Sequence, residues 1–330
     1  MLLTGSCSYD TILIYAVFGA GKGILSMLNI ADFAGDRLLA KLIDPLAINE
    51  RYTESSLKGV KFIRSSISFP RGSVVYEPSI VIVAQGHKIG YLGNKVYRYD
   101  PYNYLVLSVP LPFECETVGT PEEPLLGISI GVDVATVSEL MLEMDDNSSL
   151  SSSIPRGIYA TALTSELTDA TIRLLKSLSS PLDGRILGPQ IVREIIYRVL
   201  CGEQGESLRA LAIRHSRFSQ IAKVLNRMHM EYDSEIDVGT LANEANMSVS
   251  SFHSNFKAVT AVSPLQYLKS IRLHKARMLM IQDGIGASNA ASKVGYESPS
   301  QFSREFKRYF GCNPTEAANK MQAAVEVSGS

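Results

Sequence analysis

The sequence predicts an α+β protein in which a β-barrel of the jelly-roll type precedes an all-α domain. The α domain should hold two helix-turn-helix units joined by a linker helix. Apolar residues alternate with period two between residues 61 and 143, with turn signals between the runs. Near the C-terminus a short phenylalanine pattern occurs twice, 50 residues apart, with a helical apolar periodicity between the copies. These observations together predict the two-part fold.

Length and composition limit the function classes. The chain has 330 residues, 45% of them apolar, which is enough for two or three domains with buried cores. Its four cysteines lie far apart and form no C-x-x-C pair, which argues for a reducing compartment and against a zinc site. No apolar run reaches transmembrane length. We therefore expect a cytoplasmic protein with no membrane partner.

Charge is distributed unevenly along the chain. Residues 208–325 contain 15 Lys and Arg against 9 Asp and Glu, a net charge of +6, whereas residues 1–207 carry −6. A basic C-terminal part beside an acidic N-terminal part fits a DNA-binding module joined to a different kind of domain. Ordinary scatter of charge along the sequence is the alternative.

Periodicity and composition divide the chain into four expected segments. They are an N-terminal extension with a short helix (1–49), the barrel (50–145), a linker with a helical connecting segment (146–230), and the double helix-turn-helix domain (231–325).

The first segment carries no signal that assigns it a role. Residues 19–23 are glycine-rich like a phosphate loop, but the first glycine and the magnesium-binding Ser or Thr of that motif are missing. An amphipathic helix is expected over residues 36–44. We expect residues 1–26 to add nothing to fold or function, with the working protein beginning at Met27. The alternative is that the apolar residues 12–18 cover a patch on the barrel.

Short strands punctuated by turns define the barrel segment. Tyr- and Val-rich strands of this kind could line a ligand cavity or fill a core, and the sequence leaves both open. The strand-like runs are residues 74–76, 79–85, 88–92, 95–99, 104–108 and 126–130.

A polar run at 145–153 is expected to be a linker, and three helical patterns follow at 168–178, 187–201 and 208–230. These helices could mediate a dimer contact or simply pack against the barrel. Both interpretations stay open.

The repeated pattern occupies residues 251–257 and 301–307. In each copy two Phe four residues apart lie on one helical face, and polar residues point away. Ser248 and Ser298 are expected to cap these two helices, the second with Pro299 at its first position. Each copy follows a short Ala-rich helix after a tight turn, which is the helix-turn-helix plan.

Between the copies, Ser263 and Pro264 should open a helix of about 19 residues, roughly 28 Å long at ~1.5 Å per residue. Such a rod would hold two reading helices on one side of a duplex. Side chains opposite the Phe face are candidate base contacts: Ser250, Ser251, His253, Ser254, Ser300, Gln301 and Arg304. The candidate phosphate contacts are Ser248, Lys257, Lys269, Arg272, Ser298, Lys307 and Arg308. For any single basic residue, a solvated surface position is the alternative.

These residues resemble the AraC/XylS-type bacterial transcription regulators, subgroup with an N-terminal cupin-like sensor. The resemblance departs from the family pattern at Ala261, where glycine is usual, and at Ala317-Ala318, which replace Tyr-Arg. In the double helix-turn-helix domain, the matching segments are residues 263–268, 272–276, 294–307 and 310–314. In the barrel, they are residues 76–80, 84–88, 97–100, 104–112 and 122–126.

The resemblance implies a transcription regulator, an activator in keeping with the family, with double-stranded promoter DNA and RNA polymerase as partners. A small-molecule effector at the barrel and a homodimer are further expectations. We expect no catalytic residues, no metal and no cofactor, because residues 1–207 contain one histidine, His87. The alternatives are a metal-free cupin enzyme fused to a DNA-binding domain, and a regulator whose barrel only dimerises.

Overall fold

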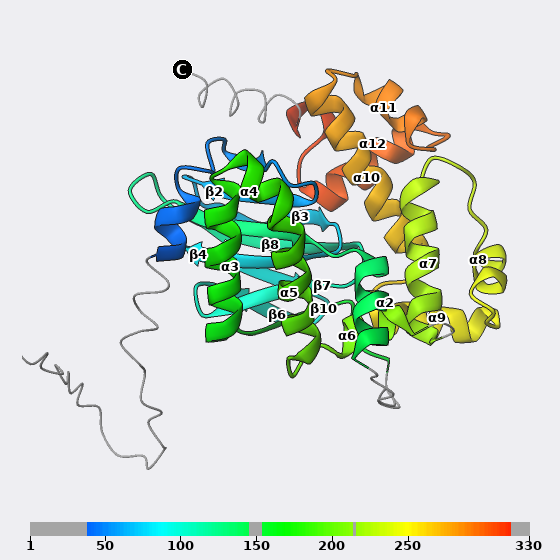
Figure 1. Ribbon diagram of the computed structural model, residues 1–330. Helices are drawn as coiled ribbons and strands as arrows, with labels where there is room; N and C mark the ends of the chain where they lie inside the picture. Colours follow the sequence, from blue (N-terminus) through cyan, green and yellow to red (C-terminus); the bar gives the residue numbers. More distant parts are fainter. Residues whose placement is uncertain (1–37, 145–153, 214–215, 318–330) are drawn as a thin grey trace, which may run out of the picture.

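The computed structural model describes residues 38–144, 154–213 and 216–317 (Figure 1). The expectations for residues 1–26 and for the polar run at 145–153 lie outside the described residues. A two-sheet antiparallel β-sandwich, a helical layer on one side of it and a second group of helices on the other side make up the described chain. The predicted α+β fold class is confirmed.

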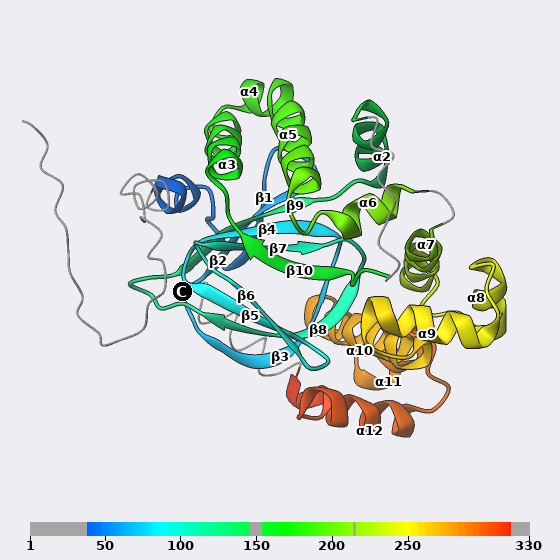
Figure 2. The same ribbon diagram turned by 90° about the horizontal axis from the view of Figure 1, so that it is seen from below.

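Two sheets stack face to face in the sandwich (Figure 2). The first has six strands in the order β1 (Arg51–Glu54), β2 (Val60–Ser65), β9 (Leu125–Gly131), β4 (Ser79–Gln85), β7 (Asn103–Leu107) and β10 (Ile158–Ala162). The second has four strands in the order β3 (Phe69–Tyr76), β8 (Leu111–Val118), β5 (His87–Leu92) and β6 (Lys95–Tyr99).

The six-stranded sheet is buried on both faces. On its central strand β4, Ile80 and Ile82 face the helical layer, whereas Val81 and Val83 face the second sheet. The layer consists of α3 (Ser165–Leu178), α4 (Pro181–Ile186) and α5 (Gly188–Cys201), which lie over the outer face (Figure 1). Burial on both faces explains why β4 reads as a continuous apolar run rather than an alternating one.

Two features of the connecting segment differ from the sequence-based expectation. The strand β10 returns after the Ser-rich run and pairs with β7, with Ile158 opposite Leu107. The expected helix at 208–230 is two helices, α6 (Glu206–Ala212) and α7 (Arg217–Met230), because the Ser216 side chain accepts a hydrogen bond from the Ser219 amide and caps a new helix.

The double helix-turn-helix region follows the predicted plan. We call α8 (Val238–Glu244) with α9 (Val249–Thr260) the first unit, and α11 (Ala287–Lys293) with α12 (Pro299–Phe310) the second unit. The linker helix α10 (Pro264–Gln282) has 19 residues and opens with a capping box at Ser263. One further helix, α2 (Val134–Glu143), leads out of β9.

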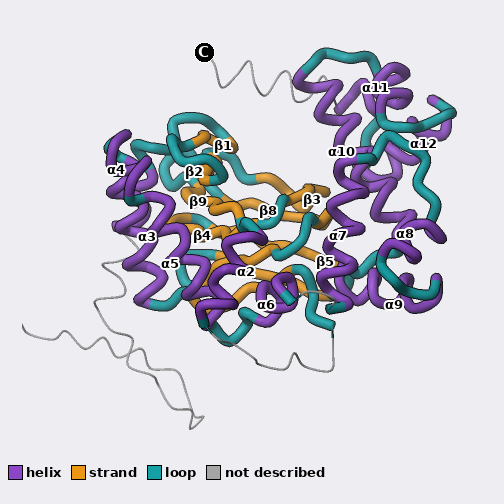
Figure 3. Tube along the Cα trace, turned by 45° about the vertical axis from the view of Figure 1, so that its right-hand side comes forward, coloured by secondary structure: helices purple, strands orange, loops and turns teal. Residues whose placement is uncertain are grey.

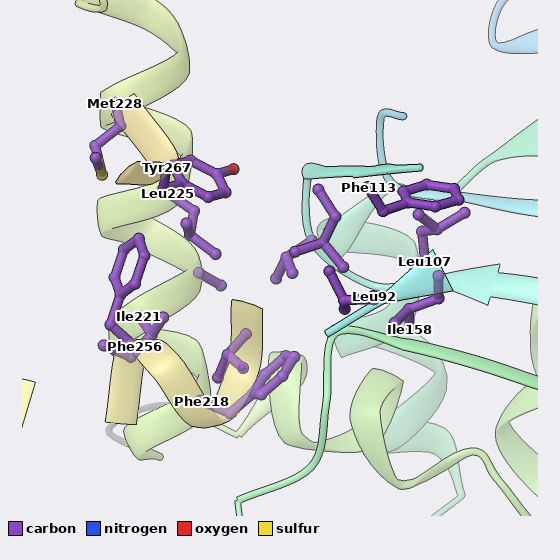
Figure 4. Close-up of a cluster of buried hydrophobic side chains, with 14 of the residues drawn as sticks. Leu92, Leu107, Phe113, Ile158, Phe218, Ile221, Leu225, Met228, Phe256 and Tyr267 are labelled. Atoms are coloured by element: carbon purple, nitrogen blue, oxygen red, sulfur yellow. The ribbon is translucent and has the colours of Figure 1, made fainter. Parts of the chain in front are cut away.

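The two units belong to different cores. Phe218, Ile221 and Leu225 of α7 lie opposite Leu107 and the other sandwich residues labelled in Figure 4, in a cluster that also contains the Phe pair of α9. The Phe pair of α12 lies in a separate cluster with the C-terminal half of α10. The interior of the sandwich is therefore continuous with the first unit only.

Candidate functional site

The outer face of α9 is built of short polar side chains. Phe252 and Phe256 are fully buried, with ring centroids 5.5 Å apart, and this fixes the rotation of the helix. Among the predicted base-contact residues, Ser250, His253 and Ser254 are exposed and Ser251 is half-buried. The Ser248 side chain accepts from the Ser251 amide, as the predicted cap requires.

Sequence reasoning missed Asn255, which is buried on α9. Its Nδ2 donates to Ser251 Oγ at 3.2 Å, so the Ser251 hydroxyl is oriented from within the helix. A polar residue at a core-facing position between the two Phe was the only available signal.

The outer face of α12 carries longer side chains. Phe302 and Phe306 repeat the geometry of the first unit, with ring centroids again 5.5 Å apart. The Ser298 side chain accepts from the Gln301 amide and Pro299 occupies the first turn, as predicted. Ser300, Gln301 and Arg304 are exposed.

Glu305 organises the surface around Gln301. One carboxylate oxygen accepts from Lys269 Nζ at 2.8 Å and from Gln301 Nε2 at 3.2 Å, while the other accepts from the Tyr296 hydroxyl at 2.9 Å. Burial alone would raise the pKa of Glu305, but these hydrogen bonds outweigh it and hold the pKa below its usual value. Glu305 therefore ties the linker helix to the second unit. Nothing in the sequence pattern had singled it out.

Three of the candidate phosphate contacts already have local partners, since Ser248 and Ser298 cap their helices and Lys269 is paired with Glu305. The other four fall into two groups. Lys257, Lys307 and Arg308 are exposed near the C-terminal ends of α9 and α12. Arg272 is half-buried and its guanidinium donates to the backbone carbonyls of Tyr232, Ser234 and Gly295. Arg272 thus holds the loop before α8 and the turn before α12 against α10. Its phosphate contact, like those of the other candidates, stays a prediction.

A cavity of about 710 Å³ lies between the sandwich and the second group of helices. Strands β3 and β8 form one wall, and α10 with the C-terminal end of α12 forms the other. The hydroxyl of Tyr76, a lining residue, lies 3.5 Å from the hydroxyl of the buried Tyr99, and Tyr99 Oη lies 3.1 Å from Sγ of Cys115, a second lining residue. Burial raises the pKa of Tyr99 well above its usual value, so the Tyr99 phenol is uncharged at neutral pH.

Positive charge dominates this cavity. Lys88 is 8% exposed, its Nζ lies 5.7 Å from the centroid of the Tyr76 ring, and it forms no ion pair with a carboxylate among the described residues. Arg277 has a buried Nε without a hydrogen-bond partner among the described residues. Burial lowers the pKa of His229 to about 4 and of His274 to about 3, each with help from a nearby cation, so both imidazoles are neutral at pH 7.

The described residues include no group of three or more His, Cys, Asp or Glu that could hold a metal ion. His87 begins strand β5 and pairs with Val118. Among the same residues, no helix is long and apolar enough to cross a membrane.

Comparisons with known proteins agree with the two-part architecture. The AraC-type transcriptional regulator N-terminus matches residues 56–207, and the helix-turn-helix domain family matches residues 241–320. The HTH-type transcriptional activator RhaS of Enterobacter sp. (strain 638) is 24% identical over 157 residues, which are 42% of this chain and 56% of RhaS.

The RCS-specific HTH-type transcriptional activator RclR of Escherichia coli (strain K12) is 35% identical over 85 residues, 26% of this chain and 30% of RclR. The matches to the first curated relatives span only 36 to 56% of those relatives' own length. Among solved structures, ToxT of Vibrio cholerae with a bound unsaturated fatty acid shares the fold. Its TM-score is 0.54 at 13% identity, over 82% of this chain and 97% of ToxT.

Proposed function

The chain belongs to the AraC family of transcriptional regulators, and from this membership we propose that it is a sequence-specific DNA-binding regulator whose β-sandwich responds to a small molecule. The observation that carries the proposal is the paired geometry of α9 and α12. Both helices begin at a serine cap, bury two Phe at the same ring separation and leave polar side chains exposed on the opposite face. This is the arrangement of a reading helix in a major groove.

The two reading helices differ in what they can recognise. Arg304 can form a fork of hydrogen bonds with guanine, and Gln301 can do so with adenine. The serines of α9 favour short or water-mediated contacts. We therefore assign the sharper sequence preference to α12 and a weaker one to α9, with Lys257, Lys307 and Arg308 on phosphates.

We place the effector in the cavity between the sandwich and α10. A buried ammonium group without a carboxylate partner is costly, and an anionic ligand would compensate it. Lys88 from the sandwich and Arg277 from α10 both line this cavity, so one anion could bridge the sensor and the reader. The apolar side chains beside them, including Ile271 and Phe310, favour a ligand with an apolar part.

The remaining partners are proposals of the same kind. RNA polymerase and a second copy of the chain follow from the family's role at promoters, and so does a cytoplasmic location. The family is one of regulators, and the proposal includes no enzymatic step.

Electrostatics offers a direct test of DNA binding. We expect the full chain to bind promoter DNA with an affinity that falls roughly 100-fold between 50 and 200 mM salt if about four phosphates are neutralised. Replacing Lys307 or Lys257 by Ala should reduce the slope of log affinity against log salt by about one unit each. Lys41→Ala, at an exposed lysine of the N-terminal helix over residues 38–43, is the matched control and should leave the slope unchanged. Binding that does not depend on salt would contradict the proposal.

The effector cavity can be tested with anilinonaphthalene sulfonate, an apolar anion whose fluorescence rises on binding. We expect the full chain to bind it, and Lys88→Gln to weaken the binding about tenfold, because a charge-assisted hydrogen bond is lost. Lys58→Gln is the control, since Lys58 is exposed and lines neither this cavity nor the second one. If Lys88→Gln and the parent protein bind the probe equally, the effector does not bind in this cavity. That result would not affect the proposal that the chain binds DNA.

A further inference from the structure

A second cavity, of about 530 Å³, lies where the free edges of the two sheets approach each other. Strand β6 ends the four-stranded sheet and β10 ends the six-stranded one. The start of α6 and the segment that leads into β10 complete the walls. None of its lining residues belongs to the cavity between the sandwich and α10, so the two are separate.

Polar atoms without partners are concentrated here. Across the described residues, six buried side-chain nitrogen or oxygen atoms have no hydrogen-bond partner in the protein. Four of the six belong to residues that line this cavity: Tyr97 Oη, Arg156 Nη1, Tyr159 Oη and Ser207 Oγ. Tyr97 and Tyr159 are each 8% exposed and Ser207 is 2% exposed. Buried polar groups in native proteins are almost always satisfied, so such a concentration indicates a missing partner.

The two tyrosines lie on different sides of the six-stranded sheet at its β10 edge. Tyr97 belongs to the cluster inside the sandwich, whereas Tyr159 and the neighbourhood of Ser207 belong to the cluster beneath the helical layer. The edge strands themselves add backbone donors and acceptors that no neighbouring strand uses. A partner bound at this edge could therefore receive hydrogen bonds from several directions.

Charge and hydrogen-bonding character define the class of partner. Arg156 is a donor only, and neither it nor Lys95 has an ion-pair partner among the described residues. The third cation of the lining, Arg98, is already paired with Asp100 at 2.7 Å. The phenols and the serine hydroxyl can both donate and accept, so they suit hydroxyl groups on a ligand.

We propose that this cavity is a second small-molecule site, which binds a small hydroxylated oxyanion: a hydroxy carboxylate or a phosphate ester. Arg156 receives the oxyanion, and Tyr97 and Ser207 receive the hydroxyl groups. Its size lies in the range of small-ligand pockets. The site does not depend on DNA binding or on the other cavity, so it goes beyond the proposed function.

Matched probes on the full chain separate the two recognition elements. Citrate and glycerol 3-phosphate supply the carboxylate and phosphate forms of the oxyanion. Propane-1,2,3-tricarboxylate is citrate without its hydroxyl, and glycerol is the second probe without its charge. By calorimetric titration we expect at least one of the two anions to bind, and its matched analogue to bind at least tenfold more weakly.

Four variants then assign the contacts. Arg156→Gln should weaken binding of the anion at least tenfold, since a hydrogen bond to a charged group is lost. Tyr97→Phe and Ser207→Ala remove unpartnered hydroxyls without changing shape, and each should weaken binding several-fold. Ser108→Ala is the control, because Ser108 Oγ is also buried and unpartnered but lines neither cavity. It should leave binding unchanged.

Two results would overturn the proposal. One is the absence of binding by both anions at 10 mM, which would mean that the cavity holds water only. The other is binding that persists unchanged in Arg156→Gln and Tyr97→Phe but is lost in Lys88→Gln, which would place the anion in the cavity beside α10. Because Tyr97→Phe preserves the packing of the sandwich, it remains informative if Arg156→Gln fails to fold.

Discussion

The two helix-turn-helix units share a local geometry but differ in what surrounds them. Phe252 and Phe256 of the first unit belong to the cluster that fills the β-sandwich, whereas Phe302 and Phe306 of the second unit have a cluster of their own. The same sequence pattern has thus produced two reading helices in different surroundings. The first is packed into the core of the sandwich, and the second is packed in a separate core. The sandwich shares its core only with the first unit, and it meets the second unit at the cavity where β3 faces the C-terminal end of α12.

The junction with the first unit is held by specific contacts. The Tyr267 hydroxyl donates to the Pro110 carbonyl at 2.7 Å and lies 2.9 Å from His229 Nε2. The Gly157 amide donates to the Val259 carbonyl at 3.2 Å, and a Cβ at Gly157 would approach Val109 Cγ2 to 2.3 Å. These contacts join β8, the entry to β10, α9 and α10 into one packed unit.

The linker helix α10 spans both environments. Tyr267, Leu268 and Ile271 lie in the cluster of the sandwich, and Leu273, Ala276 and Met280 lie in the cluster of the second unit. A change in the sandwich can therefore reach the second unit through a movement of α10, or directly where β3 meets the C-terminal end of α12. The ion pair between Lys269 and Glu305 adds a surface link between them.

Truncation of the paired phenylalanines gives the largest expected effect. Phe256→Ala and Phe306→Ala should each destabilise the chain by about 3–5 kcal/mol, because each leaves a cavity in a packed cluster. The two substitutions should loosen different parts of the chain. Amide hydrogen exchange of Phe256→Ala should rise in β5, β8 and the first unit together, whereas Phe306→Ala should raise it in α11 and α12. Equal exchange in the sandwich for both variants would show that the two cores are not separate.

The two reading helices should also differ in how strictly they recognise bases. Arg304→Ala should cost roughly 1–3 kcal/mol at one base position of the site read by α12, since a forked contact is lost. Lys307→Ala should weaken all sequences alike. Ser254, which stands at the equivalent place in the first unit, should have a smaller effect when replaced by Ala. Selection of bound sequences from random DNA measures all three. If Arg304→Ala lowers the affinity for all DNA sequences equally, Arg304 contacts a phosphate rather than a base.

The smallest effect concerns the ends of the two reading helices. Ala261 and Gly311 follow α9 and α12 in the left-handed region, with φ of 63° and 76°. Gly311→Ala should destabilise by about 1–2 kcal/mol through the backbone alone, because an added Cβ would meet nothing within 4 Å. Ala261→Gly should stabilise by a smaller amount, since it also removes a half-buried methyl. Thermal unfolding of both variants would detect shifts in opposite directions. A stabilising Gly311→Ala would contradict the strain argument.

Local signals predicted most of the fold. The serine caps at Ser248, Ser263 and Ser298 and the Phe pairs fixed the reading helices and the linker helix, because these features act within a few residues. Strands β4 to β7 were likewise marked by turns on either side. The assignment of individual residues to bases or phosphates stays a prediction.

Long-range features could not be predicted in this way. Strand β10 is short and gains its place from pairing with β7, across some 50 residues of chain. Lys88 has the sequence context of an ordinary strand residue, and only the closure of α10 over β3 and β8 makes it a buried cation. Leu265 of the linker helix is apolar but 53% exposed, whereas Tyr267, Leu268 and Ile271 of the same helix lie in the cluster of the sandwich.

The most direct test of the account is a footprint of the full chain on DNA obtained by binding selection. The full chain is needed, because removal of the sandwich would expose the core that it shares with the first unit. Two units on one rigid linker helix predict two protected major-groove segments, about one helical turn apart and on one face of the duplex. A single protected groove, or two segments on opposite faces, would contradict the two-reader account.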